Sequence, residues 1–485
     1  MYNKNNYENK YDTLIYPLYN ISHNISNNFN ELNINKNINK NTFNYSIKNR
    51  KDLTFLEVYS IDPDNCEDAD DAFSIYEEND ELYLYIHIAD PTEHIEINSD
   101  LFNEIIEKNI TKYPSFRKPI HLMPQQIVDL SSLMENTHGN IKNAISVVYK
   151  INNTTYEPYE EIKFFFSHIK VKKENILSYK RVSLYYKVNK TLNICYKISN
   201  VLKEKRSKQT KGIKLNDINI SYPIIDNNNN NDNIYLYEDT KDEKNIKQMI
   251  AEFAIYTNSF IGLYLKNNLN GLGIFRTCNA SDWLNTLKDT ITGKELLNGI
   301  IDNGISANYL STNASHDLVG IPEYCHFTSP IRRATDCICH YLLKYIHFCN
   351  YYPDLEVPFD TNFLNYVSNK SMIEAKKAKK IQYLDNKFRI IQVIDCMLNK
   401  EKDNTVKIVF RITKYSGLFL NVIICNINEK HIHLSYSLKI KIKNYIHEPE
   451  KEHELFIKQV FCFEKFDENT IPELDIYLKN KFSFL

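Results

Sequence analysis

The chain has 485 residues, which is long for one domain, so two or three domains are expected. Its 59 Lys and Arg residues nearly balance 61 Asp and Glu residues, so net charge does not indicate a nucleic-acid partner and any basic surface must be local. No apolar run approaches the roughly 20 residues that are needed to cross a bilayer, which argues against a membrane protein.

The numbers of Cys and Gly residues indicate the cellular compartment and exclude one kind of nucleotide-binding site. The ten Cys residues show no paired spacing and no signal peptide opens the chain, so we expect reduced thiols and a cytoplasmic protein. An organelle address within residues 1–46 stays open, although this segment lacks the Arg residues of a transit peptide. With only 10 Gly residues, the chain contains no G-x-x-x-x-G-K-[ST] loop, so nucleotide binding by such a loop is not expected.

Three regions differ in residue pattern, and this difference gives the predicted domain order. Residues 1–46 are Asn-rich and weakly periodic, and we expect a poorly ordered extension, or a reduced module that can bury little. Residues 47–400 are predicted to form an α+β domain, with a mixed β-sheet packed by helices. Residues 401–485 contain four or five short β-rich runs, which are typical of a small barrel of the oligonucleotide-binding kind.

Hydrophobic periodicity predicts the elements of the α+β domain. A period of two indicates strands, and spacings of three and four indicate helices. The predicted elements are strands over 55–61, 72–76 and 82–89, a turn at 78–80, and helices over about 246–265 and 363–398. Asn227–Asn231 is predicted to be a surface loop between two strand-like segments.

The segment Asp62–Asp71 carries six acidic side chains, and no Lys or Arg occurs between Asp52 and Glu107 to neutralise them. Two unit charges about 4 Å apart cost roughly 4 kcal/mol at an effective dielectric constant near 20, so the folded chain needs a cation or protons there. Hard oxygen ligands select Mg²⁺ or Mn²⁺. A metal-dependent phosphoryl-transfer site is therefore the leading hypothesis, with a solvated acidic loop as the alternative.

Two other interpretations of this acidic segment fail. A calcium loop of the EF-hand type would need Gly at Glu67 and a bidentate Glu at Phe73. Disorder is not expected because hydrophobic strands flank the segment closely. The acidic residues are thus predicted to lie in a short loop held by a sheet, which is the rigid support that a metal site needs.

A second constellation lies at His326–Arg333. Ser329 can cap a helix whose first residue is Pro330, so a helix is predicted to begin there. Arg332 and Arg333 would then lie in its first turn, against the usual dipole preference, unless they bind an anion such as phosphate. A solvent-facing Arg pair is the alternative.

A zinc site is a weaker interpretation of the same region. The candidate ligands are Cys325, Cys337, Cys339 and His340. Their spacing does not fit a known zinc motif, and helical geometry would send these side chains in different directions.

Together the two constellations resemble the catalytic (RNB) domain of the ribonuclease II / ribonuclease R family. The resemblance covers roughly residues 47–400, and the C-terminal barrel is similar to an S1-type RNA-binding domain. The residues that carry it, in chain order, are Ser60–Pro63, Asp68-x-Asp70-Asp71-Ala72, Ile86–Asp90, Ile120–Pro124, Ile250–Phe253 with Asn258, Gly273–Arg276 and His326–Arg333.

The resemblance implies hydrolysis of single-stranded RNA from the 3′ end, with Mg²⁺ and release of nucleoside 5′-monophosphates. It implies that two metal ions take part, which can activate water and neutralise the leaving oxygen. By motif position, Asp62, Asp68 and Asp71 would hold metal, and Asp70 would orient the attacking water or share in binding the metal pair. Arg332 would stabilise the scissile phosphate.

Two further residues would bind RNA by the same resemblance. Tyr113 would stack on the 3′-terminal base, and Arg333 would add to the phosphate contact. Ordinary packing is the alternative for Tyr113, because the chain contains 35 Tyr residues.

The chain departs from the family pattern in three places. Ala334-Thr335 follows the Arg pair where the family has an aromatic residue and Pro, and Lys379 stands where Glu is common. The cold-shock barrels that grip RNA in the family have no room in residues 1–46. Substrate grip and processivity are therefore open, and the basic run Lys376–Lys380 is either a phosphate contact or a solvated face.

The sequence thus predicts an active, Mg²⁺-dependent (or Mn²⁺-dependent) 3′→5′ exoribonuclease whose partner is single-stranded RNA. The alternatives are a non-catalytic RNA-binding or scaffold homologue and a metal-dependent nuclease that acts on DNA. Retention of four Asp residues and Arg332 argues against the scaffold, because a non-catalytic protein gains nothing from mutually repulsive carboxylates. Protein partners are not indicated by the sequence.

Overall fold

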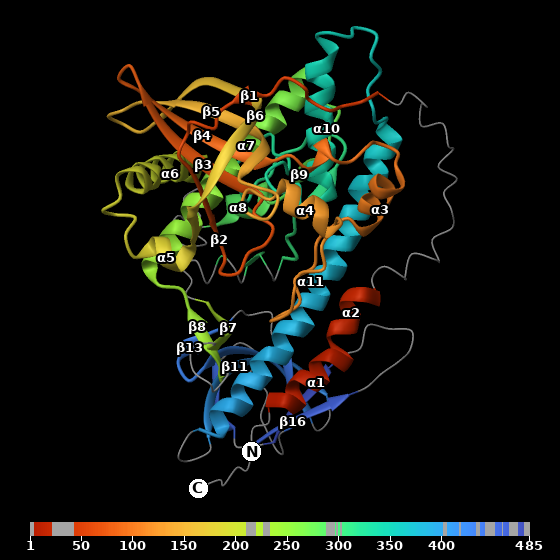
Figure 1. Ribbon diagram of the computed structural model, residues 1–485. Coiled ribbons are helices and arrows are strands. Elements are labelled where there is room, and N and C mark those ends of the chain that lie inside the picture. Colours follow the sequence, from red (N-terminus) through yellow and green to blue (C-terminus); the bar gives the residue numbers. More distant parts are fainter. Residues whose placement is uncertain are drawn as a thin grey trace.

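The computed structural model has a mixed α+β architecture in which a long helix joins two sheets (Figure 1). It describes residues 4–21, 43–209, 220–226, 233–287, 296, 299–300, 303–400, 405–416, 419–432, 437–441, 452–457, 459–464 and 474–479. Among the described helices, none combines the length and the apolar character that a membrane span requires.

The first sheet holds the acidic segment. Its strands are β1 (Lys51–Asp52), β2 (Val58–Asp62), β3 (Asp71–Glu78), β4 (Glu81–Ala89), β5 (Ile141–Ile151) and β6 (Pro158–Ser178). The order is β1-β6-β2-β3-β4-β5, and β6 pairs with β5 through its first half and with β2 through its second, so the sheet closes on itself. The predicted strands over 72–76 and 82–89 are confirmed as β3 and β4, and β2 begins three residues later than predicted.

Several helices follow these strands or lie between them along the chain. They are α3 (Asp100–Lys108), α4 (Gln125–Ser131), α5 (Tyr179–Ser183), α6 (Lys190–Gln209), α7 (Lys241–Asn268), α8 (Ser281–Thr286), α10 (Ala334–Cys349) and α11 (Thr361–Leu398), with a 3₁₀ turn η2 at Pro91–Glu93. A capping box between Thr240 and Glu243 starts α7, and Asp360 caps α11. The predicted helices over 246–265 and 363–398 are confirmed within α7 and α11.

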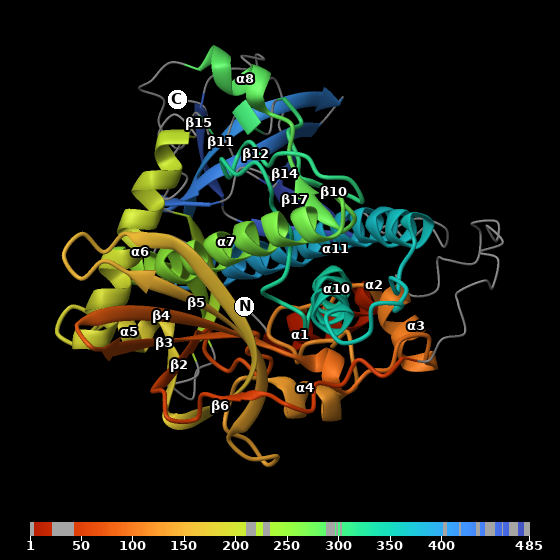
Figure 2. The ribbon, with the colours of Figure 1, turned by 90° about the horizontal axis from the view of Figure 1, so that it is seen from above.

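Helix α7 packs along one face of the first sheet (Figure 2). Its Phe253 ring meets the ring of Phe73 on β3 edge-on, and its Thr257 accepts a hydrogen bond of 3.0 Å from Tyr149 on β5. Two short strands beyond it, β9 (Phe275–Thr277) and β10 (Asn308–Leu310), form a separate antiparallel pair.

The prediction that a helix begins at Pro330 is wrong, because α10 begins at Ala334 and its N-cap is Arg333. The backbone N–H of Ser329 donates to the side chain of Asp336, and that of Ile331 donates to Asp70. These N–H groups are therefore paired without a helix, and 329–333 forms a turn. The two arginines still lie at the positive end of the helix dipole, and their contacts with Asp70 and Asp336 offset this conflict.

The expectation that residues 1–46 are poorly ordered is wrong for the part that the structure describes. Residues 4–21 form helices α1 (Lys4–Leu14) and α2 (Tyr16–Ile21), which lie beside the lower half of α11 (Figure 1). Tyr and aliphatic residues at spacings of three and four supply an apolar stripe despite the Asn-rich composition. The buried members of this stripe are Tyr11, Leu14, Ile15, Leu18 and Tyr19. Residues 22–42 lie outside the described residues.

The second sheet is built mainly from the C-terminal region. Its strands are β11 (Val406–Ser416), β12 (Phe419–Ile427), β13 (Lys430–His431), β14 (Ser437–Lys441), β15 (Glu452–Ile457), β16 (Gln459–Glu464) and β17 (Leu474–Lys479). The described pairings run β15-β11-β12-β14-β17-β16, with β13 on β12. The predicted β-rich character is confirmed, and closure into an S1-like barrel stays a prediction.

A hairpin of β7 (Ser221–Asp226) and β8 (Asn233–Glu238) reaches this second sheet, where Lys430 Nζ donates 2.6 Å to the carbonyl of Leu236. The predicted surface loop between the two strands lies outside the described residues. A second hydrophobic core joins α1, α2 and the end of α11 to β11, β12 and β15. The domain boundaries at 46 and 400 stay predictions.

Candidate active site

The acidic loop connects the end of β2 to the start of β3, so Asp62 and Asp71 lie at its two ends. Backbone contacts hold the loop between neighbouring segments. The carbonyl of Ala69 accepts a hydrogen bond of 2.9 Å from the N–H of Leu133, and the N–H of Ala69 donates one of 3.0 Å to Ser132 Oγ. The carbonyl of Asp70 accepts 2.8 Å from the N–H of Ala89, at the end of β4. The acidic side chains are therefore attached to a rigid support.

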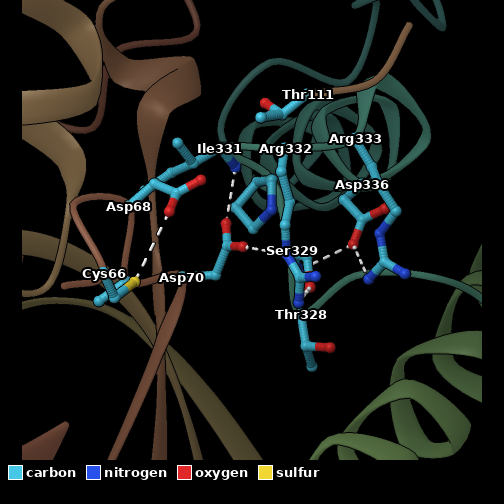
Figure 3. Close-up of polar contacts among 12 residues, drawn as sticks. Cys66, Asp68, Asp70, Thr111, Thr328, Ser329, Ile331, Arg332, Arg333 and Asp336 are labelled. Carbon is cyan, nitrogen blue, oxygen red and sulfur yellow. Dashed lines mark hydrogen bonds and ion pairs between the residues drawn. The ribbon is translucent and has the colours of Figure 1, made fainter. Parts of the chain in front are cut away.

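Asp70 contacts the turn that contains the arginines. Its Oδ1 accepts 2.8 Å from the backbone N–H of Ile331, and its Oδ2 accepts 2.7 Å from Arg332 Nε (Figure 3). Arg332 also donates from Nη2 to Ser329 Oγ at 2.8 Å. The Asp70 side chain is only 2% exposed, whereas that of Arg332 is 45% exposed. The guanidinium is thus fixed from the protein side and open on its other side.

Burial leaves the carboxylates of this loop short of compensating charge. It raises the pKa of Asp70 to about 8, although the charge of Arg332 pulls in the opposite direction. Burial also raises the pKa of Asp62 and of Asp71, and in Asp71 the charge of Asp62 is the next contribution. Ser60 Oγ donates 2.7 Å to Asp62 and partly offsets its burial. A cation would relieve this excess of negative charge.

Asp68 connects the acidic loop to Tyr113. The Tyr113 hydroxyl donates 2.6 Å to Asp68 Oδ2, and Cys66 Sγ lies 3.6 Å from the other oxygen. The Tyr113 residue is 41% exposed, so its ring is accessible beside the site. A backbone contact from Thr111 N–H to the carbonyl of Arg332, at 3.0 Å, brings this segment alongside the arginine turn.

Arg333 points away from the acidic residues (Figure 3). Its Nη2 donates 2.9 Å to Asp336 Oδ1, and its Nη1 lies 3.1 Å from Nδ1 of His326. Of the predicted site residues, Asp70 therefore contacts Arg332 and Asp68 contacts Tyr113, whereas Arg333 pairs with Asp336. The assignment of Asp62, Asp68 and Asp71 to a common metal site stays a prediction.

The donors of this site fit a divalent metal in type and in charge, since carboxylate oxygens are the ligands that Mg²⁺ and Mn²⁺ prefer. The positions fit less well. Within the described part of the chain, no three Asp, Glu, His or Cys side chains converge closely enough to hold an ion in this conformation. Metal binding would therefore require side-chain rotation around the acidic loop. The same finding gives no support to the zinc interpretation.

Sequence reasoning missed two contributors to the site. The backbone N–H of Ile331, which fixes Asp70, has no side-chain signal that could have revealed it. His121 lies with Nδ1 3.9 Å from Asp68 Oδ2 and is nearly buried, and its position in an apolar segment gave no sign of this.

The chain resembles known proteins in both sequence and structure. Residues 50–348, more than half of the chain, match the family described as RNB domain. Exoribonuclease 2 of Buchnera aphidicola (subsp. Acyrthosiphon pisum, strain Tuc7) is 28% identical over 341 residues, which cover 61% of this chain and 50% of that protein. The chain therefore spans about half the length of this curated relative.

Three solved structures share the fold. The Dss1 exoribonuclease active-site mutant from Candida glabrata has a TM-score of 0.66 and 16% identity, over 90% of this chain and 57% of its own. Mycoplasma genitalium RNase R in complex with ribose-methylated single-stranded RNA has a TM-score of 0.63 and 18% identity, over 90% and 69%. Yeast Ssd1, a pseudonuclease, has a TM-score of 0.58 and 17% identity, over 81% and 50%. These similarities confirm the predicted α+β fold of the RNB type.

Proposed function

The chain belongs to the RNB domain family, and from this premise we propose that it hydrolyses single-stranded RNA from the 3′ end to nucleoside 5′-monophosphates. The observation that carries the proposal is the contact between Asp70 and Arg332, at 2.7 Å. It joins an excess of buried carboxylates to a half-exposed guanidinium. Phosphodiester hydrolysis needs both, because charge builds on the phosphate as water attacks.

The proposed metal is Mg²⁺ or Mn²⁺, held by Asp62, Asp68 and Asp71. These residues would hold such ions, which would supply the activation of water and the neutralisation of the leaving oxygen. The pKa values of Asp62 and Asp71, raised by burial, support this assignment, because a cation favours the ionised carboxylates.

Arg332 is assigned to the scissile phosphate and Asp70 to the attacking water. Asp70 accepts from Nε of Arg332, which orients the guanidinium so that its remaining donors can face a phosphate. Because this orientation is fixed before RNA binds, it costs no reorganisation as the negative charge develops. Each Asp70 oxygen accepts one hydrogen bond from the arginine turn, which would leave further lone pairs for the attacking water.

Tyr113 is assigned to the 3′-terminal base. Its hydrogen bond to Asp68 holds the ring beside the acidic loop, and its exposed face is available for stacking. Stacking on an aromatic ring contributes about 1–3 kcal/mol per base without sequence preference. The RNA-binding role predicted for Arg333 stays a prediction, because its guanidinium would have to leave Asp336 to reach RNA.

A second candidate function is RNA binding without turnover. The observation that favours it is the shared fold with the pseudonuclease Ssd1. The buried carboxylates argue against it, since their mutual repulsion is a cost that brings no benefit to a protein without turnover.

One assay separates the two functions and also tests DNA. We would incubate 5′-labelled single-stranded RNA or DNA with the protein in Mg²⁺ or EDTA, alongside Asp70→Asn. Asparagine keeps an oxygen for the Ile331 N–H but removes the charge. The proposal expects a metal-dependent ladder from the 3′ end on RNA only, lost in the variant while RNA is still bound. Intact RNA in Mg²⁺ would favour the binding protein, and equal digestion of DNA would favour a nuclease of broader specificity.

A further inference from the structure

Residues 112–120, named here the Tyr113 loop, are closed at their base by two backbone hydrogen bonds. Lys112 N–H donates 3.0 Å to the carbonyl of Ile120, and Ile120 N–H donates 2.8 Å back to Lys112. Within the loop, Phe116 has a φ of 59°, in the left-handed region that is unfavourable for a bulky side chain. Such a backbone persists only when its surroundings hold it, so the contacts of the loop determine its shape.

Helix α11 binds both polar backbone groups of the loop residue Ser115. Its N–H donates 2.8 Å to Asp385 Oδ2, and its carbonyl accepts 3.1 Å from Arg389 Nη2. The Arg389 guanidinium also lies 4.8 Å from the ring centre of Phe116. Asp385 and Arg389 are one helical turn apart, so a single face of α11 holds the tip of the loop.

Residues of the N-terminal helices α1 and α2 also bind Asp385 and Arg389. Asp385 Oδ2 also accepts from the hydroxyls of Tyr11, at 2.8 Å, and Tyr19, at 2.6 Å. Arg389 donates 2.8 Å to Glu8 and lies 3.9 Å from the ring centre of Tyr11. Asp385 is 0% and Arg389 1% exposed, so their charges depend on protein partners rather than on water.

The loop also contacts the N-terminal helices directly, through its first residue and through Arg117 in its second half. Lys112 Nζ donates 2.9 Å to the backbone carbonyl of Tyr19, in α2. Arg117 Nη2 lies 2.8 Å from Asp12 and 2.9 Å from Glu8, both in α1. The loop is thus held directly by α1 and α2 at Lys112 and Arg117, and through α11 at Ser115.

We infer that helices α1 and α2 position the Tyr113 loop and thereby determine how tightly the 3′ end of the RNA is held. The consequence for RNA rests on the proposed function, in which Tyr113 stacks on the terminal base. Tyr11 and Tyr19 are positioning residues that act through Asp385. The segment that composition marked as a poorly ordered extension thereby becomes part of the substrate-binding apparatus.

The test uses the full chain with the double substitution Tyr11→Phe, Tyr19→Phe, which keeps both rings in the core and removes both hydroxyls from Asp385. Two quantities are measured: amide hydrogen exchange of residues 112–120, and KM and kcat on single-stranded RNA. We expect exchange in the loop to rise about tenfold or more while β4 and β5 keep their protection. We expect KM to rise about tenfold with kcat within about twofold.

Leu192→Ala in α6 is the matched control. Leu192 is buried in the hydrophobic core that includes residues of the first sheet, so this substitution should lower the stability of the protein without touching the loop. An equal rise in KM in this control, at a matched loss of thermal stability, would overturn the inference. Wild-type exchange in the loop of the double variant would also overturn it.

The same measurements distinguish failure of the proposed function from failure of this inference. If the wild-type protein leaves RNA intact, that function is lost, yet the exchange data still decide whether α1 and α2 hold the loop. If the double variant has a mobile loop but the wild-type KM, the link from loop to RNA is refuted and the structural coupling stands.

Discussion

Arg332 donates from Nε to Asp70 Oδ2 at 2.7 Å, across a separation of 262 residues in the sequence. Arg332→Lys tests whether this geometry matters beyond the charge. Lysine keeps the positive charge but lacks Nε and the planar fork, so it cannot bind Asp70 and a phosphate in fixed directions. We expect kcat to fall about 10²–10³-fold with a smaller change in RNA affinity, measured by single-turnover hydrolysis and filter binding.

Lys190→Arg is the control for this prediction, because it also exchanges the cationic head group while keeping the charge, on an exposed side chain at the start of α6. It should leave both constants near their wild-type values. A Lys variant at position 332 with wild-type kcat would show that charge alone suffices and would remove the fixed guanidinium from the mechanism.

Local patterns were enough to predict most of the elements near this contact. The alternation in β4 and the helical spacing in α11 depend on near neighbours in the sequence, and both elements were predicted correctly. The start of α10 was predicted wrongly. The N–H groups of Ser329 and Ile331 donate to the carboxylates of Asp336 and Asp70, and the helix begins only after them. The partner of Ile331 lies far away in the sequence, so no local pattern reveals it.

The same limit explains the error at the N-terminus. Composition indicated that residues 1–46 could not bury much, and it concealed that Tyr11 and Tyr19 share one buried acceptor on α11. The roles of the candidate site residues stay predictions, and the structure shows that Asp70 and Arg332, which come from two separate motifs, contact each other. Arg333 was grouped with Arg332 because the two are adjacent, yet its partner is Asp336.

Metal binding should depend on pH, with a direction set by the raised pKa values of Asp62, Asp70 and Asp71. Burial raises each above the unfolded value near 3.9, so their stabilising contribution is full below that value and is lost as pH rises through the folded pKa. A divalent ion replaces these protons. We therefore expect Mn²⁺ to raise Tm more at pH 8 than at pH 6, measured against EDTA at each pH.

The prediction compares Tm with and without metal at one pH, because other groups also titrate between these pH values. Burial lowers the pKa of His87 to about 3, so its contribution is present above the unfolded value near 6.5 and is lost as pH falls. That slope opposes the one from the carboxylates, and it cancels when Tm with and without metal is compared at one pH. Asp62→Asn should reduce the metal-induced shift, and an equal shift at both pH values would contradict the prediction.

Tyr113 offers a test of stacking that separates the ring from the hydroxyl. Tyr113→Ala removes both, and a loss of about 1–3 kcal/mol corresponds to a KM raised roughly 5- to 150-fold. Tyr113→Phe keeps the ring and removes only the hydrogen bond to Asp68, so its KM should stay within about threefold. Steady-state kinetics on RNA with different 3′-terminal bases should show little base preference. Equal defects in the two variants would indicate that the hydroxyl, not stacking, is important.

The pair of Arg333 and Asp336 allows a test of structure against RNA binding. Asp336 is 0% exposed and accepts from the backbone N–H of Ser329 as well as from Arg333. Asp336→Ala would leave a largely buried guanidinium without its partner, which costs about 3–5 kcal/mol. We expect this loss in the free energy of unfolding by urea, together with lower kcat, because the turn that holds Arg332 is no longer fixed.

Arg333→Ala and the double variant Arg333→Ala, Asp336→Ala complete a double-mutant cycle. The cycle isolates the free energy of coupling between the two side chains. If Arg333 supports the turn, the double variant should be more stable than Asp336→Ala alone, and the salt dependence of RNA binding should keep its wild-type slope. If Arg333 instead binds a phosphate, its removal should reduce the slope of log K against log salt by about one while the free energy of unfolding changes little. The contacts with Asp336 and His326 favour the first result, because the Arg333 guanidinium would have to give up both contacts to bind RNA.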